Sequence, residues 1–557
     1  MTVDPIVLEV VRNGLAAVAE EMNATLIRTA YSPNIKERRD CSCALFDAEA
    51  RMIAQAENIP VHLGAMPFSV AEALEAFPKE DLEPGDGILV NDPFRGGAHL
   101  PDLTLITPLF VEDQLFGFAA NRAHHADIGG SHAGSVAATT DIYQEGLRIP
   151  PVRLFDSGDP VDDVMAIILS NTRAPEERRG DLRAQHAANR TGHRRSAALV
   201  DRHGMETVEE TIDAILAYSE RRMRAEIDSL PDGTYQFSDV LEDDGQGTTD
   251  IRLQVTVEIT GEDLHVDFSG SASQTAGGIN AVYAVTASAT YYAIRCVTDP
   301  NIPPNAGCYR PISISAPEES IVHAEPPAAV VGGNLETSQR IVDVIFGAFA
   351  ERMPERAIAA SQGTMNNLTI GGVDPQTGRE YAFYETIAGG LGARATADGI
   401  DGIQVHMTNT MNTPIEVLET AYPLRVRRYC LREDTGGAGT FRGGLGVRRD
   451  IEIRAHAATV SVLGERRRTA PFGIADGKAG ATGGDATVVD WETRDIPAKS
   501  THHLQDGDRI SVRSPGGGGY GPPTDRDPDA IEADVKAGKI SREHAERVYG
   551  WTGDGQE

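Results

Sequence analysis

Apolar residues near the start of the chain recur at the spacing of an α-helix. Asp4 can accept hydrogen bonds from the first free amides of a helix, and Pro5 suits its first turn because the fixed backbone angle of proline is already helical. The apolar positions that follow are three or four residues apart and share one helical face: Leu8, Val11, Leu15, Val18, Met22 and Leu26. The pattern predicts a long first helix that packs against a core or a partner.

Short apolar runs between polar turns predict strands farther along. Residues 88–90 form a short buried strand candidate that ends at Asn91-Asp92-Pro93. Residues 103–111 and 115–124 are longer candidates, joined by the polar residues Glu112-Asp113-Gln114. We expect these two strands to form an antiparallel hairpin. Val111 would then lie opposite Leu115, and counting back along both strands places Asp102 opposite His124.

Helical and strand patterns alternate over the remaining chain. Helical periodicity appears at residues 161–171, 207–230, 281–297 and 336–350. Alternating or short strand-like runs with glycine-rich turns occupy residues 232–268 and 371–513, and residues 527–550 resemble two short helices interrupted at Ala537-Gly538.

These patterns predict a mixed α/β fold of several units, because a chain of 557 residues is longer than one hydrophobic core usually serves. We expect an N-terminal α/β part that bears a metal site, a mixed α/β middle part, a β-rich and glycine-rich part, and a short helical tail. Their expected ranges are 1–230, 231–370, 371–523 and 524–557.

The expected hairpin brings together side chains that bind metals. Directly opposed residues have β-carbons roughly 5 Å apart, which lets Asp102 and His124 reach one ion at about 2.0 to 2.2 Å. His99 lies just before the first strand and can fold back from its turn to the same point. Imidazole and carboxylate together favour zinc, manganese or iron over calcium or magnesium.

Each of these residues also has a structural explanation. A surface hairpin often carries isolated histidines and aspartates, and His124-His125 would then lie in solvent. Asp40 follows a charged string and fits a turn or a salt bridge, whereas His62, in the apolar segment Ile59–Gly64, fits a buried structural histidine. Spacing alone therefore leaves the metal site open, and it assigns neither Asp40 nor His62 to it.

Composition narrows the classes of function. With 83 acidic and 51 basic residues the formal net charge is −32, and this field repels nucleic acid and anionic membrane surfaces. No apolar run approaches the roughly 18 residues that cross a bilayer. The N-terminus lacks the basic and apolar segments of a secretory signal, so we expect a cytoplasmic protein. The five cysteines are too few and scattered for a disulfide scaffold.

Several common catalytic motifs are absent from the sequence. There is no phosphate-binding loop of the Gly-x-x-x-x-Gly-Lys-Ser/Thr type and no Gly-x-Ser-x-Gly elbow of a serine hydrolase. The glycine-rich run Gly436–Gly444 has Arg442 where a dinucleotide-binding motif needs its third glycine. We therefore interpret the glycine-rich runs as turns.

Motifs spread over nearly the whole chain resemble the hydantoinase B / oxoprolinase family. This family includes the B-type chains of N-methylhydantoinases, the second half of 5-oxoprolinases and the α-type chains of acetone carboxylases. The segments that carry the resemblance are Ser32–Asp40, Ile59–Gly64, Asn91–Asp102, His124–Gly130, Asn305–Ile312, Asn412–Glu416, Arg442–Gly446 and Pro515–Gly521.

The resemblance implies an ATP-dependent amide-cleaving complex. A hydantoinase A-type partner would bind ATP and phosphorylate the carbonyl of a hydantoin, 5-oxoproline or another lactam. This chain would hold one divalent ion, activate water and open the ring. The implied ligands are His99, Asp102 and His124 with Asp40 as a further one, and the implied proton carriers are His125, Asp127 or His62.

Two other functions remain open at this point. In an α-type chain of an acetone-carboxylase-like enzyme, the same centre would join a ketone enolate to activated bicarbonate. In a non-catalytic assembly subunit, the ion would only stabilise the hairpin. Substrate screening with and without bicarbonate separates the first from hydrolysis, and the effect of metal removal on activity separates the second.

The acidic surface leads to a prediction about salt. A densely acidic surface stays hydrated at high ionic strength, where screening relieves the repulsion between its charges. We therefore expect both stability and activity to rise from low salt to molar potassium chloride, followed by circular dichroism and by turnover. Full stability at low salt would contradict adaptation to a salt-rich, halophilic cell.

Overall fold

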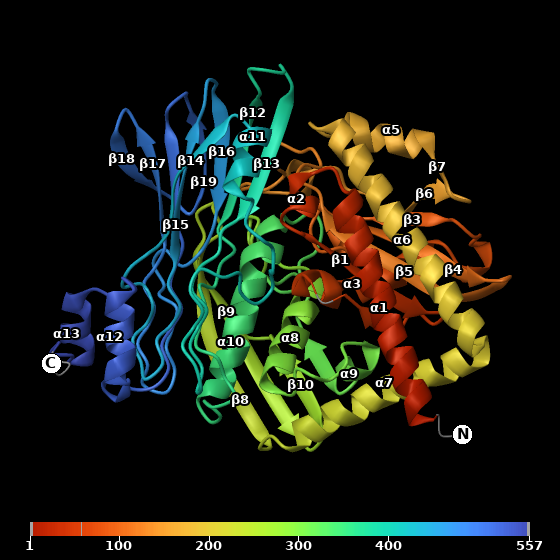
Figure 1. Cartoon of the computed structure of the whole chain (residues 1–557), viewed down its shortest axis with the longest axis horizontal. Helices are drawn as coiled ribbons and strands as arrows, with labels where there is room; N and C mark the ends of the chain where they lie inside the picture. Colours follow the sequence, from red (N-terminus) through yellow and green to blue (C-terminus); the bar gives the residue numbers. More distant parts are fainter. Residues whose placement is uncertain (1–3, 57, 554–557) are drawn as a thin grey trace.

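The chain forms four β-sheets with helices between and around them, in a computed structural model that describes residues 4–56 and 58–553 (Figure 1). The predicted mixed α/β fold is confirmed. One continuous apolar core includes Ile59, Val285 and Ile474, from distant parts of the chain, so the sheets share buried surface.

An antiparallel seven-stranded sheet organises the N-terminal part, in the order β2-β1-β5-β4-β3-β6-β7. Its strands are β1 (Cys41–Asp47), β2 (Met52–Gln55), β3 (Gly87–Val90), β4 (Asp102–Val111), β5 (Gln114–His124), β6 (Val152–Asp156) and β7 (Asp159–Pro160). The central strands are buried on both faces, because helices cover each side.

Helices cover the two faces of this sheet unequally. On one face lie α1 (Pro5–Thr29), α6 (Pro175–His203) and α7 (Met205–Asp228), and Figure 1 shows α1 and α6 side by side. The other face is covered by α3 (Pro60–Ala76), through Met66 and Val70. Shorter helices are α2 (Pro33–Lys36), α4 (Ile142–Glu145) and α5 (Asp162–Ser170).

The first helix and the hairpin agree with the sequence predictions. Asp4 caps α1 by accepting from the Ile6 amide at 2.8 Å. The hairpin turn is one residue tighter than expected, because Val111 pairs with Gln114. A bulge between Leu109 and Phe110 restores the predicted register. Asp102 therefore pairs with His124, as predicted.

The sequence did not predict α3 or α6. The buried face of α6 is largely polar: the side-chain amides of Gln185 and Asn189 donate to the carbonyls of Leu103 and Leu105 at 2.9 and 3.0 Å. Hydrogen bonds of this kind hold α6 on the sheet without an apolar stripe, so hydrophobic periodicity does not reveal the helix.

The middle part is a four-stranded sheet against two helices. The strands are β8 (Gly233–Asp243), β9 (Thr249–Thr260), β10 (Asp263–Asp267) and β11 (Ile312–Ser315), in the order β11-β10-β9-β8. The helices are α8 (Tyr283–Val297) and α10 (Ser338–Ala350), with the short α9 (Ala306–Tyr309) nearby. A π-helical segment, Gly333–Thr337, precedes α10.

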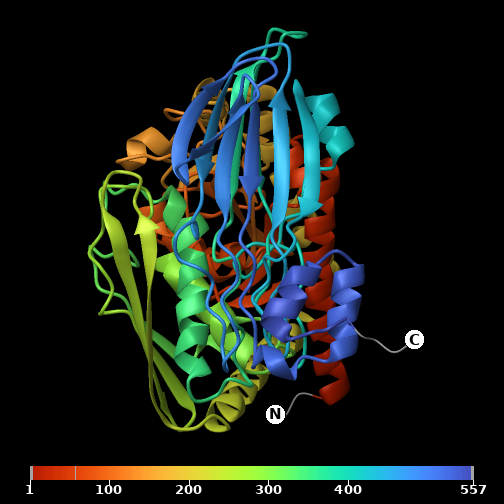
Figure 2. The ribbon, with the colours of Figure 1, turned by 90° about the vertical axis from the view of Figure 1, so that its left-hand side faces the viewer.

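The C-terminal part consists of two sheets that enclose an apolar core (Figure 2). The first sheet contains β13 (Glu380–Thr386), β12 (Asn367–Val373), β16 (Ala458–Leu463) and β19 (Lys499–Leu504). The second contains β14 (Leu424–Leu431), β15 (Val447–Ile453), β20 (Arg509–Arg513), β17 (Gly484–Val489) and β18 (Glu492–Ile496). The remaining helices are α11 (Ile415–Ala421) and, in the tail, α12 (Pro528–Lys536) and α13 (Arg542–Tyr549).

The helices and the cysteines were compared with what a membrane span and a disulfide bond require. Among the described helices, none combines the length and apolarity needed to cross a membrane. All five cysteines are free thiols.

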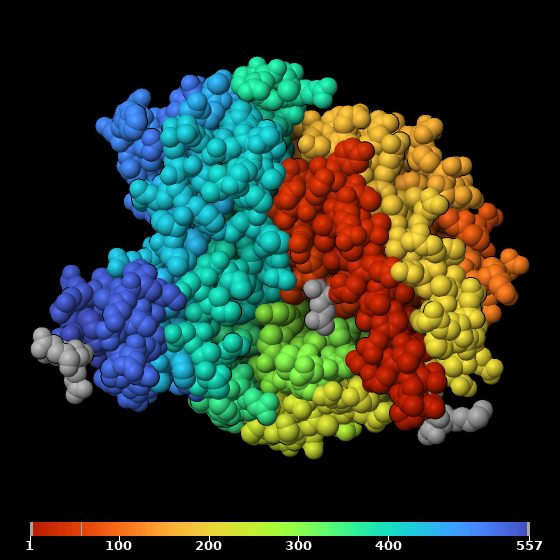
Figure 3. Space-filling model, viewed as in Figure 1, coloured from red at the N-terminus to blue at the C-terminus, as the bar shows by residue number. Residues whose placement is uncertain are grey.

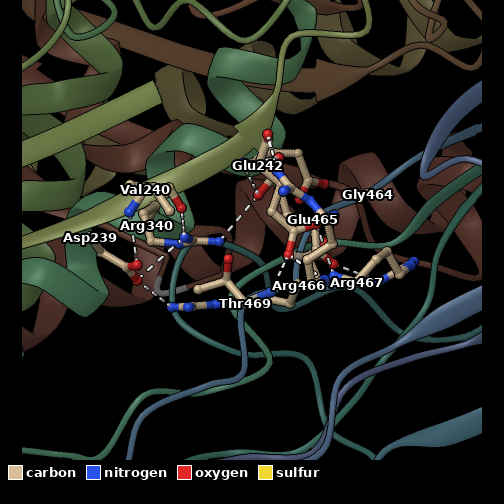
Figure 4. A network of polar contacts seen from close by, with 12 residues as sticks. Asp239, Val240, Glu242, Arg340, Gly464, Glu465, Arg466, Arg467 and Thr469 are labelled. Atoms are coloured by element: carbon tan, nitrogen blue, oxygen red, sulfur yellow. Dashed lines mark hydrogen bonds and ion pairs between the residues drawn. The ribbon is translucent and has the colours of Figure 1, made fainter. Parts of the chain in front are cut away.

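A buried ionic network joins the middle and C-terminal parts (Figure 4). Arg466 pairs with Asp343 of α10 at 2.7 Å and with Asp239 of β8 at 2.9 Å. Glu465 forms ion pairs with Lys499 at 2.6 Å and with Arg340 at 3.3 Å. The network compensates charges that would otherwise be costly to bury, and it fixes the 464–469 loop against α10 and β8.

Removal of one cation from this network should destabilise the fold. We expect Arg466→Met to lower the free energy of unfolding by about 3 kcal/mol, because the fully buried Asp343 loses its arginine partner and Asp239 keeps only Arg340. Urea unfolding followed by circular dichroism measures the change. Arg494→Met, in an exposed pair with Glu492, should cost less than about 1 kcal/mol. Equal effects of the two variants would contradict a structural role for the network.

Candidate metal centre

Three side chains converge where the hairpin opens. Asp102 begins β4, His124 ends β5, and their backbones are paired across the ladder. His99 lies in the preceding turn, which is closed by a 3.0 Å hydrogen bond from the Asp102 amide to the His99 carbonyl. All three side chains are buried.

The separations of the three facing atoms match those of ligands around one ion. His99 Nε2 lies 3.0 Å from Asp102 Oδ1, and His124 Nδ1 lies 3.2 Å from each of them. Two ligands at ~2.1 Å from an ion are about 3.0 Å apart at a right angle and about 3.4 Å apart at a tetrahedral angle. These three are the group of potential ligands that the described residues bring together.

Hydrogen bonding alone does not account for this triad. The far atoms His99 Nδ1 and His124 Nε2 are buried and have no hydrogen-bond partner among the described residues, whereas Asp102 Oδ2 is buried beside His62 Nε2 at 3.4 Å. Protons shared between the facing atoms would leave the rest of this polar cluster unsatisfied, at considerable cost. A divalent cation among the three facing atoms fits both the donor set and the burial.

The protonation states also suit a cation. Burial lowers the pKa of His99, which keeps the imidazole neutral and its lone pair free. Burial would raise the pKa of Asp102, but the surrounding imidazoles of His99 and His62 outweigh it and hold that pKa well below its usual range. The triad thus presents a carboxylate and a neutral imidazole donor at neutral pH.

His62 and Asp40 lie beside the triad. His62, in the first turn of α3, places Nε2 3.4 Å from Asp102 Oδ2 and 3.9 Å from Asp40 Oδ1. Its Nδ1 lies 3.4 Å from the hydroxyl of Ser42. Asp40 just precedes β1, and its carbonyl accepts from the His124 amide at 3.0 Å. Asp40 is therefore connected to the triad through His62 and through the backbone of His124.

Sequence reasoning did not single out Tyr384, whose ring stacks on the His124 imidazole with centroids 4.5 Å apart. Tyr384 belongs to β13, far along the chain, so no spacing pattern connects it to the hairpin. Two more unassigned residues are Asn34, which donates to the His124 carbonyl at 2.7 Å, and Arg38. Both lie within the family motif Ser32–Asp40, and that motif could have indicated that they belong to the site.

Comparison with known proteins identifies the family. Residues 4–523 match the Hydantoinase B/oxoprolinase family. The chain belongs to this family. The resemblance inferred from its motifs is thereby confirmed.

The chain spans nearly the full length of some relatives and less than half of others. An uncharacterised protein of Methanocaldococcus jannaschii, MJ0963, is 43% identical over 98% of this chain and 96% of its own. The putative B-type chain of a D-/L-hydantoinase of Pseudomonas sp. is 34% identical over 99% of this chain and 95% of its own. The 5-oxoprolinase 1 of Arabidopsis thaliana is 36% identical over 93% of this chain, which spans only 42% of that protein.

Two solved structures share the fold. An ATP-dependent caprolactamase from Pseudomonas jessenii superposes with a TM-score of 0.92 at 32% identity, over 100% of this chain and 98% of its own. An acetone carboxylase superposes with a TM-score of 0.90 at 19% identity, over 98% of this chain and 79% of its own. At that identity the second likeness concerns the fold alone.

Two of the three proton carriers expected from the sequence, His125 and Asp127, point away from the triad. His125 faces α6, where its Nε2 lies 3.0 Å from Gln185 Oε1, because successive residues of a strand point to opposite faces. Asp127 pairs with Arg173 at 2.7 Å and accepts from the amides of Gly129 and Gly134. The contacts of Asp127 stabilise the loop after β5. Of the three proton carriers expected from the motifs, only His62 therefore lies beside the triad.

The burial of His125 predicts a pH dependence of stability. Burial, with a smaller contribution from Arg178, lowers the pKa of His125 to about 4, whereas an unfolded histidine titrates near ~6.5. Between these values the unfolded chain binds the proton and the folded chain does not, so stability falls as pH falls. From pH 7 to pH 5 the original chain should lose about 2 kcal/mol more unfolding free energy than His125→Gln. Urea unfolding at both pH values measures this, and parallel losses would contradict it.

Proposed function

We propose that this chain is the metal-dependent hydrolytic subunit of an ATP-dependent complex that opens a cyclic amide. The observation that carries the proposal is the convergence of His99 Nε2, Asp102 Oδ1 and His124 Nδ1 within 3.0 to 3.2 Å of one another. Family membership supports the class of reaction, as do the relatives named as a hydantoinase chain and a caprolactamase. The substrate class is a hydantoin, 5-oxoproline or another lactam.

The three converging side chains would hold one divalent ion, which is zinc, manganese or iron by its donor set. Asp40 lies outside this group, beside His62, and would join as a further ligand, as the family motif implies. When bound, the ion supplies Lewis acidity and lowers the pKa of coordinated water. The surrounding chain excludes bulk water, since all three ligands are buried. His62 is placed to hold or release a proton at Nε2, where Asp102 and Asp40 both face it.

A second subunit would supply the ATP-dependent step. Amide carbonyls are poor electrophiles, and phosphorylation of the carbonyl oxygen makes the ring carbon open to attack. The sequence lacks a phosphate-binding loop, and the chain spans about two fifths of the 5-oxoprolinase it resembles. We assign ATP binding to a hydantoinase A-type partner in a hetero-oligomer.

The use of ATP and the five free thiols fit the reducing cytoplasm.

Carboxylation is the alternative reaction, and the acetone carboxylase match shows only that this fold also occurs in an enzyme of that class. A triad of this type would suit an enolate as well as an activated amide, because both reactions develop negative charge on oxygen. The identity of the caprolactamase match is higher than that of the carboxylase match, 32% against 19%. The caprolactamase match therefore supports ring opening as the first proposal.

Loss of one triad imidazole should abolish turnover. In the complex reconstituted with its A-type partner, we expect His99→Ala to lose ring opening by at least ~1,000-fold, and the purified variant to lose the bound ion seen by elemental analysis. His265→Ala is the control, since His265 lies on β10 and contacts Ser313. It should retain both ion and activity.

Three outcomes would contradict the proposal. Unchanged turnover of His99→Ala would remove the triad from the chemistry. Turnover of ketones that requires bicarbonate would establish the carboxylase alternative instead. Metal removal that lowers only the melting temperature, with turnover intact, would establish a purely structural ion.

A further inference from the structure

One aromatic ring from the C-terminal sheet lies against the metal centre. The Tyr384 ring stacks on the His124 imidazole, with centroids 4.5 Å apart and planes inclined by 16°. The guanidinium carbon of Arg38 lies 5.0 Å from the centroid of the same phenol ring. Figure 3 shows the C-terminal segment, in cyan, directly against the N-terminal segment, in red, on the face of the molecule where these parts meet.

The phenol is held in place by a buried chain of hydrogen bonds. The Tyr384 hydroxyl donates to Asn367 Oδ1 at 3.0 Å. The Asn367 amide in turn donates to Glu336 Oε1 at 2.8 Å and to the Leu463 carbonyl at 2.9 Å. Tyr384 is thus anchored in β12 and β16 of its own sheet and in the π-helical segment before α10.

Arg38 and Asn34 tie the same tyrosine to the backbone of the ligand. Arg38 donates to the Tyr384 carbonyl at 3.1 Å and to the Thr386 hydroxyl at 2.7 Å, and it also hydrogen-bonds Asn34. Asn34 donates to the His124 carbonyl at 2.7 Å. The backbone of His124 is therefore held by hydrogen bonds to the N-terminal segment, and its ring is in contact with Tyr384.

The far nitrogen of His124 makes this contact informative. Metal-binding imidazoles usually donate their second N–H to a carboxylate, a carbonyl or water, which fixes the rotation of the ring. His124 Nε2 is buried and has no hydrogen-bond partner among the described residues. At this far side of the ring, where metal-binding imidazoles usually have a hydrogen bond, the face of Tyr384 is the contact that restrains rotation.

We propose that Tyr384 is a positioning residue that fixes the imidazole plane of His124, so that Nδ1 stays directed at His99 Nε2 and Asp102 Oδ1. This inference rests on the proposed metal centre. It also makes the centre depend on docking of the C-terminal sheet, since the N-terminal hairpin alone lacks the stacking ring. Metal affinity then reports on the contact between the two parts.

The test compares zinc affinity in purified full-length variants, by competition with a chromogenic chelator. Tyr384→Leu removes the stack, and we expect it to weaken zinc binding about 10- to 100-fold, as loss of an orienting neighbour does. Tyr384→Phe keeps the ring and should stay within about 3-fold of the original affinity. Cobalt substitution adds a signature, because a displaced imidazole changes the visible d–d spectrum of Tyr384→Leu but not that of Tyr384→Phe.

Tyr381→Leu is the matched control. Tyr381 is a buried tyrosine of the same strand that contacts His456 and Tyr422. Its loss should cost comparable stability and leave zinc affinity unchanged. Melting curves of all variants establish that they fold.

The outcomes separate this inference from the proposed function. If the original chain binds zinc, His99→Ala does not, and Tyr384→Leu binds like the original, the metal centre stands and the positioning role is wrong. Two further results would overturn the positioning role: a loss of zinc affinity in Tyr381→Leu equal to that in Tyr384→Leu, or a large loss of zinc affinity in Tyr384→Phe. The Tyr384→Phe result decides the question even if Tyr384→Leu does not fold. If the original chain binds no divalent ion, both proposals fall.

Discussion

The antiparallel pairing of Asp102 with His124 is the contact on which the proposed metal centre depends. A shift of one residue along either strand would turn one of the two side chains to the opposite face of the sheet. The register is maintained although the turn is tight, because the bulge near Phe110 absorbs the difference. His99 then needs only the closed turn before β4 to reach the same point.

The rest of the fold surrounds this pairing with elements from three regions of the chain. The first turn of α3 contributes His62, the segment before β1 contributes Asp40, and the C-terminal sheet contributes Tyr384. Such a cluster of buried, partly unpartnered polar atoms is costly in an apolar interior. A bound cation would offset that cost, and the arrangement is therefore coherent as a metal centre and hard to explain as a structural core.

Much of the core of the site was accessible from the sequence, because a hairpin is a local structure. Strand alternation and turn residues were enough to pair Asp102 with His124, even with the wrong loop length. The family motifs added Asp40 and His62, which spacing alone could not assign. His125 and Asp127 share the same motif but face α6 and Arg173, since strand geometry separates neighbours that a motif holds together.

What could not be predicted was non-local or polar. Helix α6 is held by Gln185 and Asn189 donating to strand carbonyls, so it has little apolar periodicity to detect. Tyr384 reaches His124 only because β13 packs against the N-terminal sheet, and no pattern within either segment encodes that contact. The buried pairing of Arg466 with Asp343 is likewise a property of the folded arrangement.

Anomalous diffraction from crystals grown with zinc would show whether a single ion lies among the three converging side chains. We expect one strong zinc peak at roughly 2.0 to 2.2 Å from each of His99 Nε2, Asp102 Oδ1 and His124 Nδ1. Well-ordered side chains that point away from one another, with no anomalous peak among them at saturating zinc, would contradict it.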